Sequence, residues 1–135
     1  MNRFLRVLLT LTEVGMILYW IFATLVVLKL INVSPELMYS DYQNPLIVSW
    51  NWSFFPIDIL FALSGLVARY KPMSAQRQQL LSAVSLSLMF CAGLMAISFW
   101  VLQQSFDPAW WGVNLWLMML SSVAFVRMYS ALAHR

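Results

Sequence analysis

Four long apolar segments dominate this sequence. A helix needs about 20 mostly apolar residues to cross the roughly 30 Å hydrocarbon core of a bilayer, and each segment comes close to or exceeds that length. They lie at about residues 7–29, 46–68, 80–102 and 111–128, with short polar connectors between them. The sequence therefore predicts an all-α membrane protein, a single four-transmembrane-helix bundle over residues 1–135.

The composition excludes the soluble alternatives. Only 10% of the 135 residues are charged and 62% are hydrophobic, whereas a soluble domain has about 25% and about 45–50%. A soluble enzyme, a disordered chain and a nucleic-acid-binding module are poor interpretations, and we expect no nucleic-acid partner. The single cysteine excludes an intramolecular disulfide, and with one histidine it excludes the usual metal clusters. We expect no metal and no cofactor.

The connectors carry helix-start signals. Ser34, Asn44 and Asp107 each precede a proline, which places a capping side chain before proline at the first helical position. Ser74 can cap the third helix in the same way. The first segment is longer than a signal-peptide core and no small-residue cleavage site follows it, so we expect it to be retained as a helix.

The basic residues predict the orientation, because Lys and Arg near span ends stay on the cytoplasmic side. Seven of the eight flank one side of the predicted bundle: Arg3, Arg6, Arg69, Lys71, Arg77, Arg127 and Arg135. The other side carries Glu36, Asp41 and Asp107, with Lys29 as the basic exception. Both termini should face the cytoplasm, in a multi-pass protein of the inner (cytoplasmic) membrane surrounded by its lipids.

All seven tryptophans fall in the outer half of the predicted spans or at their outer edge. They are Trp20, Trp50, Trp52, Trp100, Trp110, Trp111 and Trp116. An aromatic belt at the membrane interface accounts for most of them. Because the cytoplasmic side has none, the alternative is an outer vestibule lined by aromatic side chains.

Two acidic residues fall within the spans, where a charge costs at least about 2.5–3.5 kcal/mol and is by default a functional hypothesis. Glu13 lies on the cytoplasmic side of the first span, at about the depth of Arg127 in the fourth. One interpretation is a structural Glu13–Arg127 ion pair. In the other, Arg127 reaches the lipid head groups and Glu13 is free to bind a proton or cation.

Asp58 lies near the middle of the second span, with no basic residue at its depth. A carboxyl in a dry site takes up a proton, so Asp58 is either a proton carrier or a hydrogen-bond donor to another helix. The donor interpretation makes it simple interhelical glue.

The neighbours of Asp58 favour a binding site. Asn51 lies seven residues before it, on the same helical face, and Pro56 should kink the helix. With Trp50 and Trp52, these residues indicate a small polar pocket that opens to the outside. The alternative is a proline-kinked helix without a ligand.

The strings LTEVGMILYW and DYQNPLIVSWNWSFFPIDILFALSGL resemble the YvaD-like family of short four-span bacterial membrane proteins of unknown function. The resemblance covers roughly the first half of the chain. It centres on Glu13, Asp41, Pro45, Trp50, Asn51, Trp52, Pro56 and Asp58. It implies a four-helix membrane protein and supplies no activity.

The segment LTEVG also resembles the first span of small multidrug-resistance transporters, in which a glutamate exchanges protons for cationic drugs. That resemblance implies this role for Glu13. The chain departs from the pattern in lacking a glycine-rich third span and in having Asp58 and an acidic outer connector.

Four functional hypotheses follow. The first is a small-molecule, lipid or proton site around Asn51, Asp58 and the adjacent tryptophans, with an apolar or amphipathic partner. The second is a proton-coupled transporter that uses Glu13. The third is an enzyme in which Asp58 or Glu13 is a general acid on an isoprenoid or lipid, although no catalytic set is recognisable. The fourth is an accessory subunit that packs against a larger membrane protein. A homo-oligomer is compatible with each of them.

Overall fold

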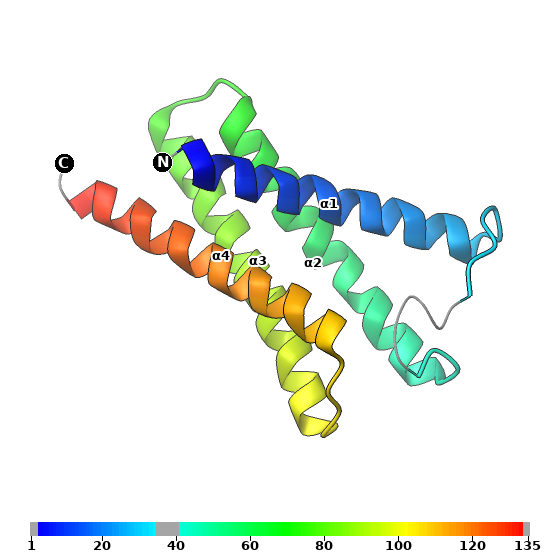
Figure 1. The fold of residues 1–135 in the computed structure, drawn as a ribbon. Helices are drawn as coiled ribbons and strands as arrows, with labels where there is room; N and C mark the ends of the chain where they lie inside the picture. The colour runs from blue at the N-terminus through cyan, green and yellow to red at the C-terminus, as the bar shows by residue number, and fades with distance from the viewer. Residues whose placement is uncertain (1–2, 35–40, 134–135) are drawn as a thin grey trace.

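The computed structural model describes residues 3–34 and 41–133 of the chain. This part of the chain forms four long helices (Figure 1). They are α1 (Arg3–Val27), α2 (Pro45–Tyr70), α3 (Ala75–Leu102) and α4 (Pro108–Ala133). All four are long and apolar enough to cross a membrane. For the described residues, the prediction of four long helices capable of spanning a membrane is therefore confirmed.

Each helix begins before its predicted span, and α2 and α4 also end after it, at Tyr70 and Ala133. The exception is α1, which ends at Val27, before the predicted end at residue 29. Three predicted caps are present. Asn44 Oδ1 accepts a hydrogen bond from Leu46 N at 3.0 Å, and Ser74 caps α3. Asp107 Oδ1 accepts from the backbone N–H groups of Ala109 and Trp110, at 2.9 and 3.2 Å. The helix start predicted at Ser34 and Pro35 cannot be compared, because Pro35 lies outside the described residues.

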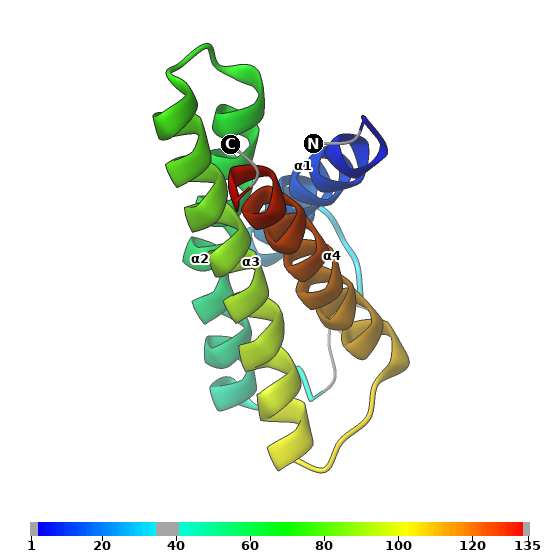
Figure 2. The ribbon, with the colours of Figure 1, turned by 90° about the vertical axis from the view of Figure 1, so that its left-hand side faces the viewer.

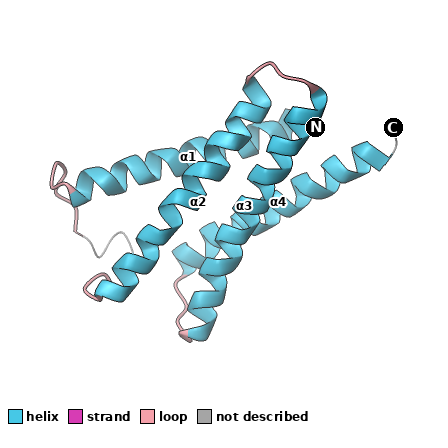
Figure 3. Cartoon of the chain, turned by 180° about the vertical axis from the view of Figure 1, so that it is seen from behind, coloured by secondary structure: helices cyan, strands magenta, loops and turns pink. Residues whose placement is uncertain are grey.

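Consecutive helices run in opposite directions and pack against each other along the chain. Figures 1 and 2 show α1 and α4 on the same side of the α2–α3 pair, with α1 on α2 and α4 on α3. From behind, α2 and α3 are nearest the viewer (Figure 3). We call the end with both chain termini and the α2–α3 connection the terminal end, and the opposite end the distal end (Figure 1).

Small residues let the helices approach closely, as is usual in membrane bundles. Ala62, Ala92 and Ala96 are buried in the contacts between helices. At Gly93 a Cβ atom would lie 2.6 Å from the backbone oxygen of Asn114, so this glycine permits the α3–α4 contact. Large apolar side chains cover the outside of the bundle, which suits a surface that faces lipid.

The helix α2 continues through Pro56 without interruption. Proline has no N–H to donate to the carbonyl four residues earlier, which here belongs to Trp52. The proline therefore does not end the helix, and the kink predicted at this position stays a prediction.

Candidate functional site

A cavity of about 450 Å³ opens among the four helices towards the distal end. We call it the aromatic cavity, after the rings in its wall: Tyr19, Trp20, Trp50, Phe54, Trp110 and Trp116. Its polar side chains include Asn51, Asp58 and Asn114. Three polar groups among aromatic walls are typical of small-molecule sites, in which a few polar atoms orient an otherwise apolar ligand.

Asp58 is buried, with 6% of its surface exposed, and it lines the aromatic cavity. Its Oδ2 atom accepts a hydrogen bond from Trp20 Nε1 at 2.9 Å. This bond joins α1 to α2, as the interhelical interpretation expects, but Asp58 accepts it and does not donate it. The role of Asp58 as a proton carrier stays a prediction. Trp20 was not among the partners predicted for Asp58, although both residues lie at similar depths in adjacent spans.

Asn51 and Trp50 line the same cavity as Asp58. Trp50 stacks on Phe99 of α3, with ring centroids 3.9 Å apart and an angle of 20° between the planes. Trp52 does not line the cavity, but it packs against Trp20 at a centroid distance of 5.2 Å. The cavity thus brings together three of the predicted α2 residues, and Trp52 contacts the ring that binds Asp58.

Asn114 lines the aromatic cavity and was not predicted from the sequence. It is buried on α4, and its side-chain amide donates a hydrogen bond to Trp110 O at 2.8 Å. On the same helix, Trp116 Nε1 donates to Thr12 Oγ1 of α1 at 3.0 Å. An amide within an apolar span was the available signal, because polar side chains at that depth are expensive.

Four of the seven tryptophans therefore line a cavity, namely Trp20, Trp50, Trp110 and Trp116. Trp100 is buried and makes an edge-to-face contact with Trp50. Such packing between rings favours the vestibule interpretation for these side chains over a belt in the lipid interface.

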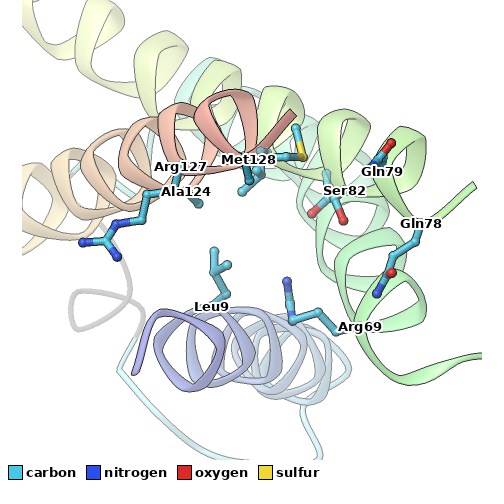
Figure 4. Close-up of a pocket in the computed structure, with 11 residues that line it drawn as sticks. Leu9, Arg69, Gln78, Gln79, Ser82, Ala124, Arg127 and Met128 are labelled. Atoms are coloured by element: carbon cyan, nitrogen blue, oxygen red, sulfur yellow. The ribbon is translucent and has the colours of Figure 1, made fainter. Parts of the chain in front are cut away.

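A second cavity, of about 220 Å³, lies at the terminal end (Figure 4). We call it the arginine cavity. Its polar wall consists of Arg69, Gln78, Gln79, Ser82, Ser85 and Arg127, and its apolar wall includes Leu9, Leu86, Ala124, Met128 and Ala131.

Glu13 pairs with Arg69 of α2, so the predicted Glu13–Arg127 pair is wrong. Glu13 is fully buried, and the Arg69 side chain is only 7% exposed. Arg127 is exposed at the arginine cavity. Glu13 is therefore not without a charged partner, and its binding of a proton or cation stays a prediction.

Gly65 provides the space that lets Glu13 pair with Arg69. A Cβ atom there would lie 2.7 Å from Glu13 Cδ and 2.6 Å from Ser85 Oγ, so the absent side chain makes room for the carboxylate. Arg69 lies four residues further along α2, on the same face of the helix. The predicted second span ended at residue 68 and assigned Arg69 to the connector, which hid this pairing.

No group of three or more His, Cys, Asp or Glu side chains within residues 3–34 and 41–133 could hold a metal ion. The arrangement offers instead a binding cavity with one acid at the distal end and a buried ion pair near the terminal end. Neither acid is accompanied by a serine–histidine or second-carboxylate partner in the contacts described above.

Comparison with known proteins places the chain in a family. Residues 5–135 match the model of a family of unknown function, DUF5360. The chain belongs to this family. It is 35% identical over 118 residues to the uncharacterized protein YvaD of Bacillus subtilis (strain 168), which covers 86% of this chain and 84% of that protein. No solved structure matches the chain significantly. The predicted resemblance to the YvaD-like family is confirmed, and it extends well beyond the first half of the chain.

Proposed function

We propose that this membrane protein binds a small amphipathic molecule or lipid in the aromatic cavity, with Asp58 and Asn51 receiving its polar group. The observation that carries the proposal is the position of a buried acid in the wall of an aromatic cavity. At about 450 Å³, the cavity falls within the range of about 300–1,000 Å³ that is typical of ligand sites.

The walls indicate the kind of ligand. Aromatic rings bury an apolar body without needing hydrogen bonds, and the amide and carboxyl groups orient a polar end. Asp58 already accepts a hydrogen bond from Trp20, so it is held in place before a ligand arrives. A preorganised group loses less conformational entropy on binding.

Tryptophan fluorescence offers a direct test, because four tryptophans line the cavity. The protein in lipid nanodiscs would be titrated with a brominated twelve-carbon alcohol and with the corresponding amine, since bromine quenches indole emission at contact. We expect saturable quenching that Asp58→Asn weakens about tenfold for the amine, because a charge-assisted hydrogen bond contributes about 1.5–3 kcal/mol.

The control is Asp41→Asn, which removes an exposed acid from the α1–α2 connector. It should bind both probes as the unmodified protein does. If Asp58→Asn and Asp41→Asn give the same titration curves, or if quenching rises linearly without saturation, the aromatic cavity is not the binding site.

We also propose that the terminal end faces the cytoplasm, in the inner (cytoplasmic) membrane. Basic residues at that end support this orientation. In a Cys91→Ser background, a membrane-impermeant maleimide added to cells whose outer surface is accessible should label Ser105→Cys and not Ser130→Cys. The reverse pattern contradicts the orientation.

Nothing in the surroundings of Glu13 favours proton-coupled transport at that residue, because Arg69 neutralises it. The enzyme and accessory-subunit hypotheses likewise gain no specific observation. Ligand binding in the aromatic cavity is therefore the function that we propose.

A further inference from the structure

We infer that the arginine cavity is a second binding site, for the phosphate group of an anionic molecule. It is separate from the aromatic cavity in position and in chemistry. The two sites have no lining residue in common. The inference therefore does not depend on the proposed function.

The charges at the terminal end favour an anion. Among the described residues, this end carries one acid, Glu13, and six basic residues, namely Arg3, Arg6, Arg69, Lys71, Arg77 and Arg127. Glu13 is already paired with Arg69. Within the described part of the chain, Arg127 has no carboxylate partner within salt-bridge distance.

These groups line the arginine cavity from different sides. Arg69 lies on one side of Leu9, and Arg127 lies on the other with its guanidinium group turned outward, while Gln78, Gln79 and Ser82 belong to α3 (Figure 4). Guanidinium groups bind phosphate oxygens through two parallel hydrogen bonds. Amides and hydroxyls can donate to the remaining oxygens.

The volume limits the ligand. At about 220 Å³, the cavity is smaller than the roughly 300–1,000 Å³ that surrounds a whole drug-sized molecule. It therefore suits a small anionic group whose remainder lies outside. The apolar side chains of Leu86, Met128 and Ala131 in the wall are compatible with the glycerol and first methylenes of a lipid.

Two sources of phosphate fit this chemistry. Basic pockets between transmembrane helices bind anionic lipid head groups, and a free phosphate or phosphorylated solute presents the same oxygens. The cavity lies at the end of the bundle, where head groups are found if the four helices span the bilayer.

The experiment compares the sources directly. The purified full chain in detergent would be titrated with dioleoyl phosphatidylglycerol, with dioleoyl phosphatidylcholine, and with inorganic phosphate against chloride at equal ionic strength. Binding would be followed by native mass spectrometry and by the melting temperature. We expect phosphatidylglycerol or inorganic phosphate to bind, and phosphatidylcholine to bind more weakly than phosphatidylglycerol.

Arg127→Gln is the decisive variant, because Arg127 is exposed and its loss leaves the Glu13–Arg69 pair intact. We expect it to weaken binding about fivefold, since one basic residue contributes about 1 kcal/mol to the attraction of an anionic group. Arg77→Gln is the matched control, an exposed arginine at the same end that does not line the cavity. Ser82→Leu fills the cavity without changing the charge and should weaken binding as well.

A loss of phosphatidylglycerol binding in Arg127→Gln and Ser82→Leu, but not in Arg77→Gln, supports a lipid head-group site. The same pattern with inorganic phosphate supports a site for a soluble anion. Equal losses in Arg127→Gln and Arg77→Gln, or an unchanged Ser82→Leu variant, would overturn the inference, because they indicate general surface attraction. Equal binding of the two lipids, together with no binding of inorganic phosphate beyond that of chloride, would overturn it too.

Discussion

The two ends of the bundle accommodate a buried acid in different ways. At the terminal end, Glu13 lies against Gly65 and pairs with a cation, Arg69. Towards the distal end, Asp58 receives a hydrogen bond from a neutral indole, and a cavity opens beside it. The ion pair satisfies the Glu13 carboxylate, so this acid has little to offer a ligand. A carboxyl held by one neutral donor can still interact with a ligand, which is why we assign the small-molecule site to the distal end.

The largest change in stability that tests this difference between the two ends is expected for a substitution of Arg69. The Arg69→Gln variant leaves the Glu13 carboxylate buried without its cation, and removing one partner of a buried ion pair costs about 3–5 kcal/mol. We expect a large loss in the free energy of unfolding, measured by denaturation in mixed micelles. The double variant Glu13→Gln/Arg69→Gln should recover most of that loss.

Arg127→Gln is the control for this prediction. Arg127 was the partner predicted from the sequence, because it lies at about the same depth in its span as Glu13. Its unfolding free energy should remain within about 0.5 kcal/mol of the unmodified protein, as is usual for exposed positions. If Arg127→Gln destabilises the protein as much as Arg69→Gln does, the assignment of the ion pair is wrong.

A smaller effect is expected at Gly65. The Gly65→Ala variant places a Cβ atom against Glu13 Cδ and Ser85 Oγ, and overpacking of this kind costs about 1–3 kcal/mol. The matched control is Gly112→Ala, where a Cβ atom has nothing within 4 Å. Equal melting temperatures for the two variants would show that Glu13 does not lie on Gly65.

The smallest effect is expected at Trp20. The Trp20→Phe variant keeps an aromatic ring but removes the Nε1 donor to Asp58, and hydrogen bonds between membrane helices contribute about 0.6 kcal/mol on average. We expect a destabilisation of about that size, and a change in amine binding in the quenching titration. Trp52→Phe serves as the control, since Trp52 packs on Trp20 without donating to Asp58.

If Trp20→Phe costs several kcal/mol and leaves probe binding unchanged, the Trp20–Asp58 contact is structural glue. That outcome would remove the contrast between the two ends, because both acids would then serve only to join α1 to α2.

The sequence was sufficient to predict the four helices, because twenty-residue apolar segments and their caps are local properties. It also predicted Asp58 and Asn51 to be neighbours, since they share one face of one helix, with Trp50 next to Asn51 in the chain. It could not identify Trp20 as the partner of Asp58, Arg69 as the partner of Glu13, or Asn114 as part of the cavity wall. Those contacts depend on which helices pack together and on the room that Gly65 provides, and neither follows from depth along a span.

The central claim is that Asp58 faces a ligand-sized cavity and not lipid or a closed helix contact. A cryo-EM map of the protein in lipid nanodiscs, prepared with the brominated amine, tests this most directly. We expect non-protein density within hydrogen-bond distance of Asp58, between α1 and α4, with bromine near the tryptophan rings. A map in which α1 and α4 close over Asp58, or in which its carboxyl faces the acyl chains, would contradict the claim.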